Sequence, residues 1–174
     1  MTHHNNLWRL IIDPPLSPQM NMAMDEAIAL TYAKIQIPTL RLYYWAAPTL
    51  SIGSFQEIGS GLSSHLKDNK IALVRRITGG RAILHDQEIT YSVVAGTEDP
   101  LFSGGIKKTF YAIGQALISG LSRLGIHPNL HIPEKENSFL RPKSPFCAES
   151  ISWYEMVVSG KKLIFTTENK INAV

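Results

Sequence analysis

The stretch Val74-Arg75-Arg76-Ile77-Thr78-Gly79-Gly80-Arg81-Ala82-Ile83-Leu84-His85-Asp86 decides how the rest of the chain is interpreted. It places two adjacent glycines among arginines, between two β-rich runs. Adjacent glycines let a backbone approach a ligand closely, and main-chain N–H groups beside arginine can hold a carboxylate or phosphate. A tight turn with solvated arginines fits the same composition. Thr78 and Arg81 flank the glycines, which argues against a simple two-residue turn.

Three ordered segments of the chain resemble the lipoate–protein ligase and octanoyltransferase family. They are PTLRLYYWAAPTLSIGSFQ at Pro38–Gln56, RRITGGRAILHDQEITYSVV at Arg75–Val94, and CAESISWYEMVVSGKK at Cys147–Lys162. The resemblance implies an α+β fold of the biotin/lipoate protein ligase type, with a mixed, largely antiparallel sheet flanked by helices. It implies one domain over residues 1–174, and it places part of an acyl pocket at Gly53–Gln56.

The resemblance also implies a catalytic pair, Cys147 and Lys162, as in the transferase branch. The Cys147 thiolate would attack an acyl group carried by octanoyl acyl carrier protein, and a lysine of a lipoyl-domain or glycine cleavage H-type protein would then accept it. An ammonium near the thiol would lower its pKa from about 8.5. Considered alone, a single cysteine is more often a buried apolar residue, and Lys162 resembles an ordinary strand-end charge.

In the ligase branch the glycine stretch would instead hold lipoyl-adenylate made from ATP and free lipoate, whereas the transferase needs no cofactor. The presence of Cys147 favours the transferase, because adenylate chemistry needs no thiol. His85 would orient the loop, move a proton, or simply bond a backbone carbonyl. The substrate-binding residues expected from the resemblance are Arg76, Thr78, Gly79, Gly80, Arg81, Ala82 and His85.

Composition excludes several other classes of protein. The chain has 174 residues, 44% hydrophobic and 18% charged, which suits one soluble globular domain. A net charge of +3 without a Lys/Arg block gives no support to nucleic-acid binding. One cysteine excludes an internal disulfide, and His127 and His131 lack the companions of a metal site. We find no signal peptide or membrane span, so we expect a cytoplasmic protein.

Hydrophobic spacing predicts the elements around the glycine stretch. Leu7–Asp13 is a strand closed by two prolines, and Ser17-Pro18 caps a helix that runs to Ile35. On this helix Met20, Met24 and Ile28 form an apolar side, while Asp25 is expected to be more exposed. A second, longer helix begins at Ser103 and stops at Gly125. The spacing also predicts an edge strand at Ile126–Ile132 and a hairpin at Trp153–Phe165.

The resemblance fails after Ile164. The family continues there with Gly-Ser-Ala and a further stretch of sheet and helix, whereas this chain continues with Phe165 and ends at Val174. We therefore expect a fold that is incomplete at its C-terminus. An open sheet edge would favour self-association, or the chain would need a second polypeptide. A shortened relative that binds an acyl group or a partner without catalysis remains an alternative. A biotin-ligase-like module shares the architecture but not the run Arg75–Ser92.

Overall fold

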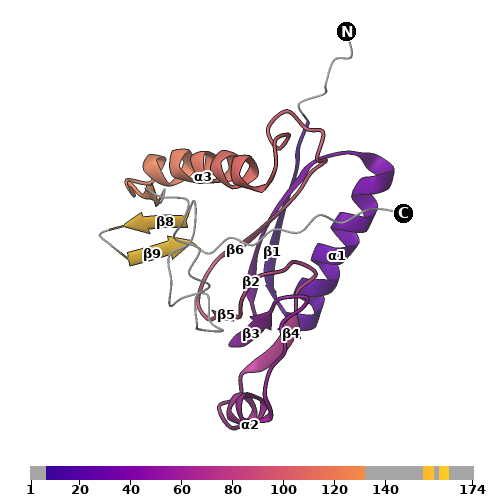
Figure 1. The fold of residues 1–174 in the computed structure, drawn as a ribbon, viewed down its shortest axis with the longest axis vertical. Coiled ribbons are helices and arrows are strands. Elements are labelled where there is room, and N and C mark those ends of the chain that lie inside the picture. Colours follow the sequence, from indigo (N-terminus) through magenta and orange to yellow (C-terminus); the bar gives the residue numbers. More distant parts are fainter. Residues whose placement is uncertain (1–6, 132–154, 159–160, 165–174) are drawn as a thin grey trace. The chain divides into compact units, whose positions relative to one another are not determined.

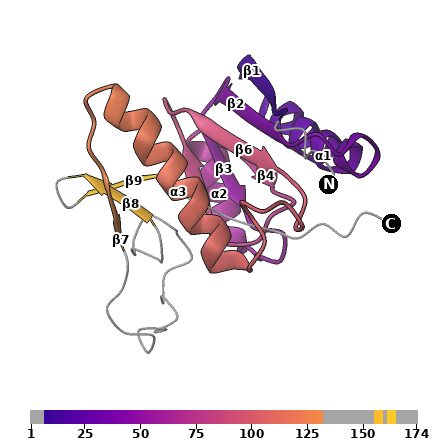
Figure 2. The same ribbon diagram turned by 90° about the horizontal axis from the view of Figure 1, so that it is seen from above.

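The computed structural model describes residues 7–131, 155–158 and 161–164. These residues form two compact units, the first within residues 7–96 and the second within residues 97–164. Figures 1 and 2 show the elements of both units from two directions. The expectation of a single domain over residues 1–174 stays a prediction.

The first unit contains a sheet in the order β1-β2-β6, formed by β1 (Arg9–Leu16), β2 (Thr39–Trp45) and β6 (Thr90–Val94). β1 runs parallel to β2, and β6 runs antiparallel to β2. The prediction that the first strand ends at Asp13 was wrong, because the strand continues through both prolines. It lies at the sheet edge, and its register shifts between Ile12 and Pro15. An edge strand with a bulge tolerates the missing proline N–H groups.

Helix α1 (Pro18–Ile35) confirms the predicted helix and its cap. The Ser17 hydroxyl accepts a hydrogen bond from the Met20 amide, and a proline occupies the first turn. The predicted apolar side was only partly right, because Met20 is 50% exposed whereas Ile28 is buried. The helix is turned so that Asn21, also fully buried, points at the β1-β2-β6 sheet.

A fully buried arginine on β2 explains this orientation of α1. Arg41 pairs with Asp13 (2.7 Å) and with Asp25 (2.8 Å), and its Nη2 donates to the Asn21 side-chain oxygen (2.9 Å). Its guanidinium also lies 4.0 Å from the centre of the Tyr43 ring. The expectation that Asp25 is exposed was therefore wrong, because its side chain is only 14% exposed. Burial raises the pKa of the Asp25 carboxyl, and Arg41 opposes that rise.

The first unit holds a second sheet in the order β4-β3-β5, formed by β3 (Thr49–Ile52), β4 (Ala72–Arg75) and β5 (Ile83–His85). All of β3 is buried, parallel to β4 and antiparallel to β5. Helix α2 (Ser60–Asp68) lies between β3 and β4 in the sequence. Residues 76–82 form the centre of the stretch Val74–Asp86, and the name glycine stretch is used for them from here on. They connect β4 with β5 and therefore lie at the end of the buried strand β3.

The second unit contains helix α3 (Ile106–Arg123) and the antiparallel sheet β7-β8-β9. The helix does not begin at Ser103, because Gly104 and Gly105 have φ angles of 122° and 86° that do not continue a right-handed helix. The predicted edge strand is β7 (Asn129–His131), and the predicted hairpin is β8 (Glu155–Val158) with β9 (Lys161–Ile164).

The predicted fold class is confirmed. Among the strand pairings of the described residues, β1–β2 and β3–β4 are parallel and the others are antiparallel. Three helices accompany these strands in the described part of the chain. None of the helices described is long and apolar enough to cross a membrane.

Candidate functional site

The buried side chain of Arg76 binds backbone carbonyls of the glycine stretch, residues 76–82. The residue is only 9% exposed, and its Nη2 donates to the carbonyls of Gly79 (3.2 Å) and Arg81 (3.0 Å). Its Nη1 donates to the Ser51 carbonyl (2.7 Å) and to the Ser51 hydroxyl (2.6 Å). One side chain therefore ties the loop to the buried strand β3. That Arg76 also grips a ligand phosphate or carboxylate stays a prediction.

Two further main-chain contacts place the carbonyls of Thr78 and Gly80 against the segment that follows β3. The Ser54 amide donates to the Thr78 carbonyl (3.0 Å). The Gly80 carbonyl lies so close to Gly53 that a Cβ built on Gly53 would be 2.1 Å from its oxygen. The Gly80 carbonyl therefore leaves room only for glycine at position 53. The loop contacts the backbone directly after β3.

The carbonyl positions determine where the loop amides point. In a trans peptide the C=O of one residue and the N–H of the next point in opposite directions. Because the carbonyls of Thr78, Gly79 and Gly80 face internal partners, the N–H groups of Gly79, Gly80 and Arg81 point away from those partners. Where successive main-chain amides converge, they can bind a carboxylate or another oxyanion.

Arg75, beside Arg76, holds the segment that follows β3. Its Nη1 donates to the carbonyls of Gly53 (2.9 Å), Ser54 (3.1 Å) and Gln56 (2.8 Å). The two neighbouring arginines thus hold two adjacent segments, Arg76 the glycine stretch and Arg75 residues 53–56. Phe55 projects from that segment with 93% of its surface exposed.

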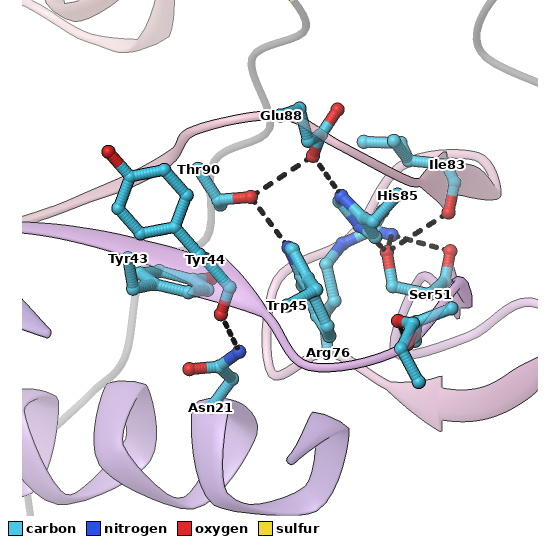
Figure 3. A network of polar contacts seen from close by, with 12 residues as sticks. Asn21, Tyr43, Tyr44, Trp45, Ser51, Arg76, Ile83, His85, Glu88 and Thr90 are labelled. Atoms are coloured by element: carbon cyan, nitrogen blue, oxygen red, sulfur yellow. Dashed lines mark hydrogen bonds and ion pairs between the residues drawn. The ribbon is translucent and has the colours of Figure 1, made fainter. Parts of the chain in front are cut away.

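His85 is the centre of a buried polar network beneath the loop (Figure 3). The residue is 4% exposed, and its Nε2 lies 2.6 Å from the Ser51 hydroxyl that also binds Arg76. Its Nδ1 contacts the Glu88 carboxylate at hydrogen-bonding distance. The partners of His85 are therefore side chains, and none of the three roles expected for it is tested by these contacts.

Trp45 and Thr90 complete the network around His85. The indole of Trp45 stacks on the imidazole with a centroid distance of 4.2 Å and an angle of 16°. Its Nε1 donates to the Thr90 hydroxyl (2.7 Å), and that hydroxyl donates to Glu88 (3.1 Å). Figure 3 shows that these contacts close a ring, so the imidazole is fixed on its face and at both nitrogens.

The order of Ser51, His85 and Glu88 is that of a hydrolase triad, but the chemistry differs. A nucleophilic serine must be reachable by substrate. Ser51 is 0% exposed, and its oxygen already accepts from the guanidinium of Arg76. The arrangement is therefore a support for the loop and not a nucleophile. No cluster of metal-binding side chains occurs among the residues that the structure describes.

The structure gathers most of the expected binding residues but leaves the catalytic pair undecided. Arg76, Gly79, Gly80 and Arg81 share one loop, whereas Ala82 is 2% exposed and belongs to the core. Cys147 lies outside the described residues. The backbone of Lys162 pairs with Val157 in the β8–β9 hairpin, but its side chain lies outside the described part of the structure.

Sequence reasoning missed Ser51 and Glu88 as parts of the site, whereas Gly53 belongs to the segment that the resemblance placed at an acyl pocket. Glu88 follows His85 by only three residues, which was the available signal for their contact. Ser51 carried no signal, because it lies 34 residues from His85 and meets it only through the pairing of β3 with β5.

The two glycines of the loop are expected to respond differently to alanine. Gly80 has a φ of 92°, so Gly80→Ala should lower the free energy of unfolding by about 1–3 kcal/mol. Gly79 has no positive φ, and nothing lies within 4 Å of a Cβ built on it, so Gly79→Ala should change stability by less than about 0.5 kcal/mol. Urea unfolding of both variants checks this, and equal effects would contradict the described loop conformation.

Comparison with known proteins identifies the relatives of this chain. Residues 17–164 match the family described as the lipoyl protein ligase A/B catalytic domain. The octanoyltransferase LipM of Kyrpidia tusciae is 40% identical over 171 residues, which cover 96% of this chain and 62% of that protein. The octanoyltransferase LipM of Bacillus subtilis is 37% identical over 172 residues, again covering 96% and 62%. The chain thus spans less than two thirds of the length of these relatives.

Solved structures of lipoate–protein ligases are also similar to this chain. Lipoate-protein ligase A bound with ATP matches with a TM-score of 0.62 and 30% identity, covering 74% of this chain and 51% of that chain. A chain from the structural analysis of a bi-partite lipoate protein ligase and its E2 lipoyl domain from Thermoplasma acidophilum matches with a TM-score of 0.61 and 30% identity. The coverage there is 72% of this chain and 48% of that chain.

Proposed function

Because this chain belongs to the lipoyl protein ligase A/B catalytic domain family, we propose that it acts in protein lipoylation as an octanoyltransferase. Its reaction moves an octanoyl group from acyl carrier protein to a lysine of a lipoyl-domain or glycine cleavage H-type protein. The observation that carries this proposal is the 35–40% identity to proteins named octanoyltransferase along nearly the whole chain. The loop amides support it independently, because the carbonyls of their peptide groups face internal partners.

In this mechanism Cys147 is the nucleophile. Its thiolate attacks the thioester carbonyl carbon, and the carrier's phosphopantetheine thiolate leaves and takes up a proton. The acceptor lysine amine then attacks the new thioester, loses a proton as the amide forms, and releases the Cys147 thiolate. Lys162 supplies an ammonium that favours the thiolate.

The glycine loop stabilises the acyl carbonyl in both steps. Negative charge develops on that oxygen as each tetrahedral intermediate forms, and fixed N–H donors lower its energy without reorganising. The amides of Gly79 and Gly80 have the orientation for this role, since their peptide carbonyls are held by internal partners. No cofactor takes part in this reaction.

Acylation of the cysteine is the direct test. Incubation with octanoyl acyl carrier protein should add one octanoyl group to the intact mass of the protein, and neutral hydroxylamine should remove it. The chain has one cysteine, so Cys147→Ser should abolish this hydroxylamine-sensitive adduct. An adduct of unchanged yield in the variant would overturn the assignment of Cys147.

Gly79→Ala tests the role of the loop without disturbing the fold. The added methyl group meets no described residue within 4 Å, so it should obstruct a ligand that lies against the loop. We expect the variant to keep its stability and to lose about tenfold or more in the rate of acyl-enzyme formation. A normal rate would mean that the acyl group lies elsewhere.

A lipoate–protein ligase is the second candidate, favoured by the solved neighbour bound with ATP. That reaction uses ATP and free lipoate, and it releases pyrophosphate when lipoyl-adenylate forms. A coupled pyrophosphate assay with lipoate separates the two candidates. Because one structural neighbour is a bi-partite ligase, the assay is run both on the isolated chain and with a second purified polypeptide added.

A further inference from the structure

We propose that Glu88 is a positioning residue that sets the conformation of the glycine stretch, residues 76–82, through a relay of His85, Ser51 and Arg76. The proposal rests on the function given above, because it assigns the relay to the loop that holds the acyl carbonyl. The relay runs from a half-exposed carboxylate, through buried side chains, to the loop carbonyls. Each link is a contact of the described first unit.

The first link fixes the proton on His85. An ionised carboxylate can only accept hydrogen bonds, so Glu88 requires a proton on Nδ1 of the imidazole. In the neutral ring the other nitrogen, Nε2, is then an acceptor. Stacking on Trp45 keeps the ring in the plane where both contacts can be made.

The second link orients the hydroxyl of Ser51. A serine has one proton to donate and two lone pairs that accept. When Ser51 donates to His85 Nε2 at 2.6 Å, its lone pairs remain for the Nη1 of Arg76, also at 2.6 Å. The other acceptor near the Ser51 hydroxyl is the Ile83 carbonyl at 3.5 Å, which is too long to compete.

The third link transmits this order to the loop. With Nη1 fixed on Ser51, the planar guanidinium places Nη2 between the carbonyls of Gly79 and Arg81. Those carbonyls set the direction of the amides that follow them. Removing Glu88 should therefore disturb amides at the other end of the relay, although Glu88 itself contacts none of them in the described structure.

The variants that test the relay are Glu88→Gln, Glu88→Ala and Ser51→Ala, with Glu57→Gln as the matched control. Glu57 is an exposed carboxylate beside the same site, so its change repeats the loss of charge outside the relay. Glu88→Gln preserves the size of the side chain and one acceptor oxygen. It should therefore restore what Glu88→Ala loses, and it remains informative if Glu88→Ala does not fold.

The first measurement needs no substrate. In ¹⁵N-labelled protein, Glu88→Ala should shift the amide resonances of Gly79 and Gly80, because Arg76 would no longer hold the Gly79 carbonyl in one position. Glu88→Gln should restore most of the wild-type resonance positions, and Glu57→Gln should change nothing. Unchanged loop amides in a folded Glu88→Ala protein would refute the relay, whether or not the chain transfers octanoate.

The second measurement uses octanoyl acyl carrier protein with the active chain. Glu88→Ala should lower kcat about tenfold and change KM by less, since the amides act on charge that develops only in the transition state. Because Glu88 and Ser51 act in one relay, the double alanine variant should be little worse than either single variant. If the fold-changes of the two single variants multiplied in the double variant, the proposal would be overturned. Loss of acyl transfer in wild-type protein would count against the proposed function alone.

Discussion

Arg41→Met is expected to lower the free energy of unfolding by about 3–5 kcal/mol, the cost of leaving buried charges without their partner. Arg41 is 0% exposed and sits between Asp13 and Asp25. Methionine matches its length but supplies no hydrogen bond, so both carboxylates would lose their common cation. The attachment of α1 to the β1-β2-β6 sheet should weaken, because Arg41 also binds the side chain and carbonyl of Asn21.

The loss should depend on pH in a defined direction. Burial already raises the pKa of Asp25, and Arg41 is what opposes the rise, so the variant should raise this pKa further. A carboxyl whose folded-state pKa exceeds its unfolded value of about 3.9 binds more protons when folded, so stability falls as pH rises through the folded pKa. The loss of unfolding free energy caused by Arg41→Met should therefore be larger at about pH 7 than at about pH 4.

Arg9→Met is the matched control for this variant. Arg9 lies on the neighbouring strand, is half-buried, and donates to the Thr39 hydroxyl at 3.0 Å. Losing that single hydrogen bond to an uncharged hydroxyl should cost about 1.5 kcal/mol. Urea unfolding of both variants at the two pH values measures the difference. Equal losses in the two variants would contradict the role given to the buried cluster.

Gly53→Ala is expected to disrupt both stability and the candidate site. The new Cβ would lie 2.1 Å from the Gly80 oxygen and 3.1 Å from the Gly79 carbonyl carbon, both of them backbone atoms. Such a contact has to be relieved by moving the loop away from β3. We expect a loss of about 1–3 kcal/mol in the free energy of unfolding, typical of overpacking, together with loss of acyl-enzyme formation.

Gly61→Ala provides the comparison. Gly61 lies within α2, and nothing lies within 4 Å of a Cβ built there, so alanine should be neutral or stabilise by about 1 kcal/mol. Urea unfolding and intact-mass acylation assays on both variants test the expectation. If Gly53→Ala retained wild-type stability and acylation, the close approach of the glycine stretch to β3 could not be correct.

Local signals in the sequence were sufficient for the elements and for the loop. Ser17 followed by a proline specifies a helix start, and the structure begins α1 there. The glycine pair predicted unusual backbone, and Gly80 has a positive φ. These features depend on residues that are close together in the chain, so they can be predicted from the order of the residues alone. The membership in a lipoylation family was also present in three short runs and is confirmed by the family match.

Tertiary structure alone decided what the charged and polar side chains do. Asp25 was expected at the surface, but packing against β2 turns it toward Arg41. Arg76 was expected to bind a ligand, which stays a prediction, and the structure adds that its Nη2 holds two carbonyls of its own loop. Both outcomes depend on which buried donors meet which acceptors, and this is fixed only when two distant segments pack together.

The meeting of Ser51 with His85 shows the physical reason most directly. The antiparallel register pairs Ser51 with Ile83 and Thr49 with His85, which brings the serine and the histidine together diagonally on one face. A shift by one residue would place them on opposite faces. The sequence by itself determined a glycine loop between two strands and the family to which it belongs. The register of β3 and β5, set by side-chain packing across the sheet, decided which residues support that loop.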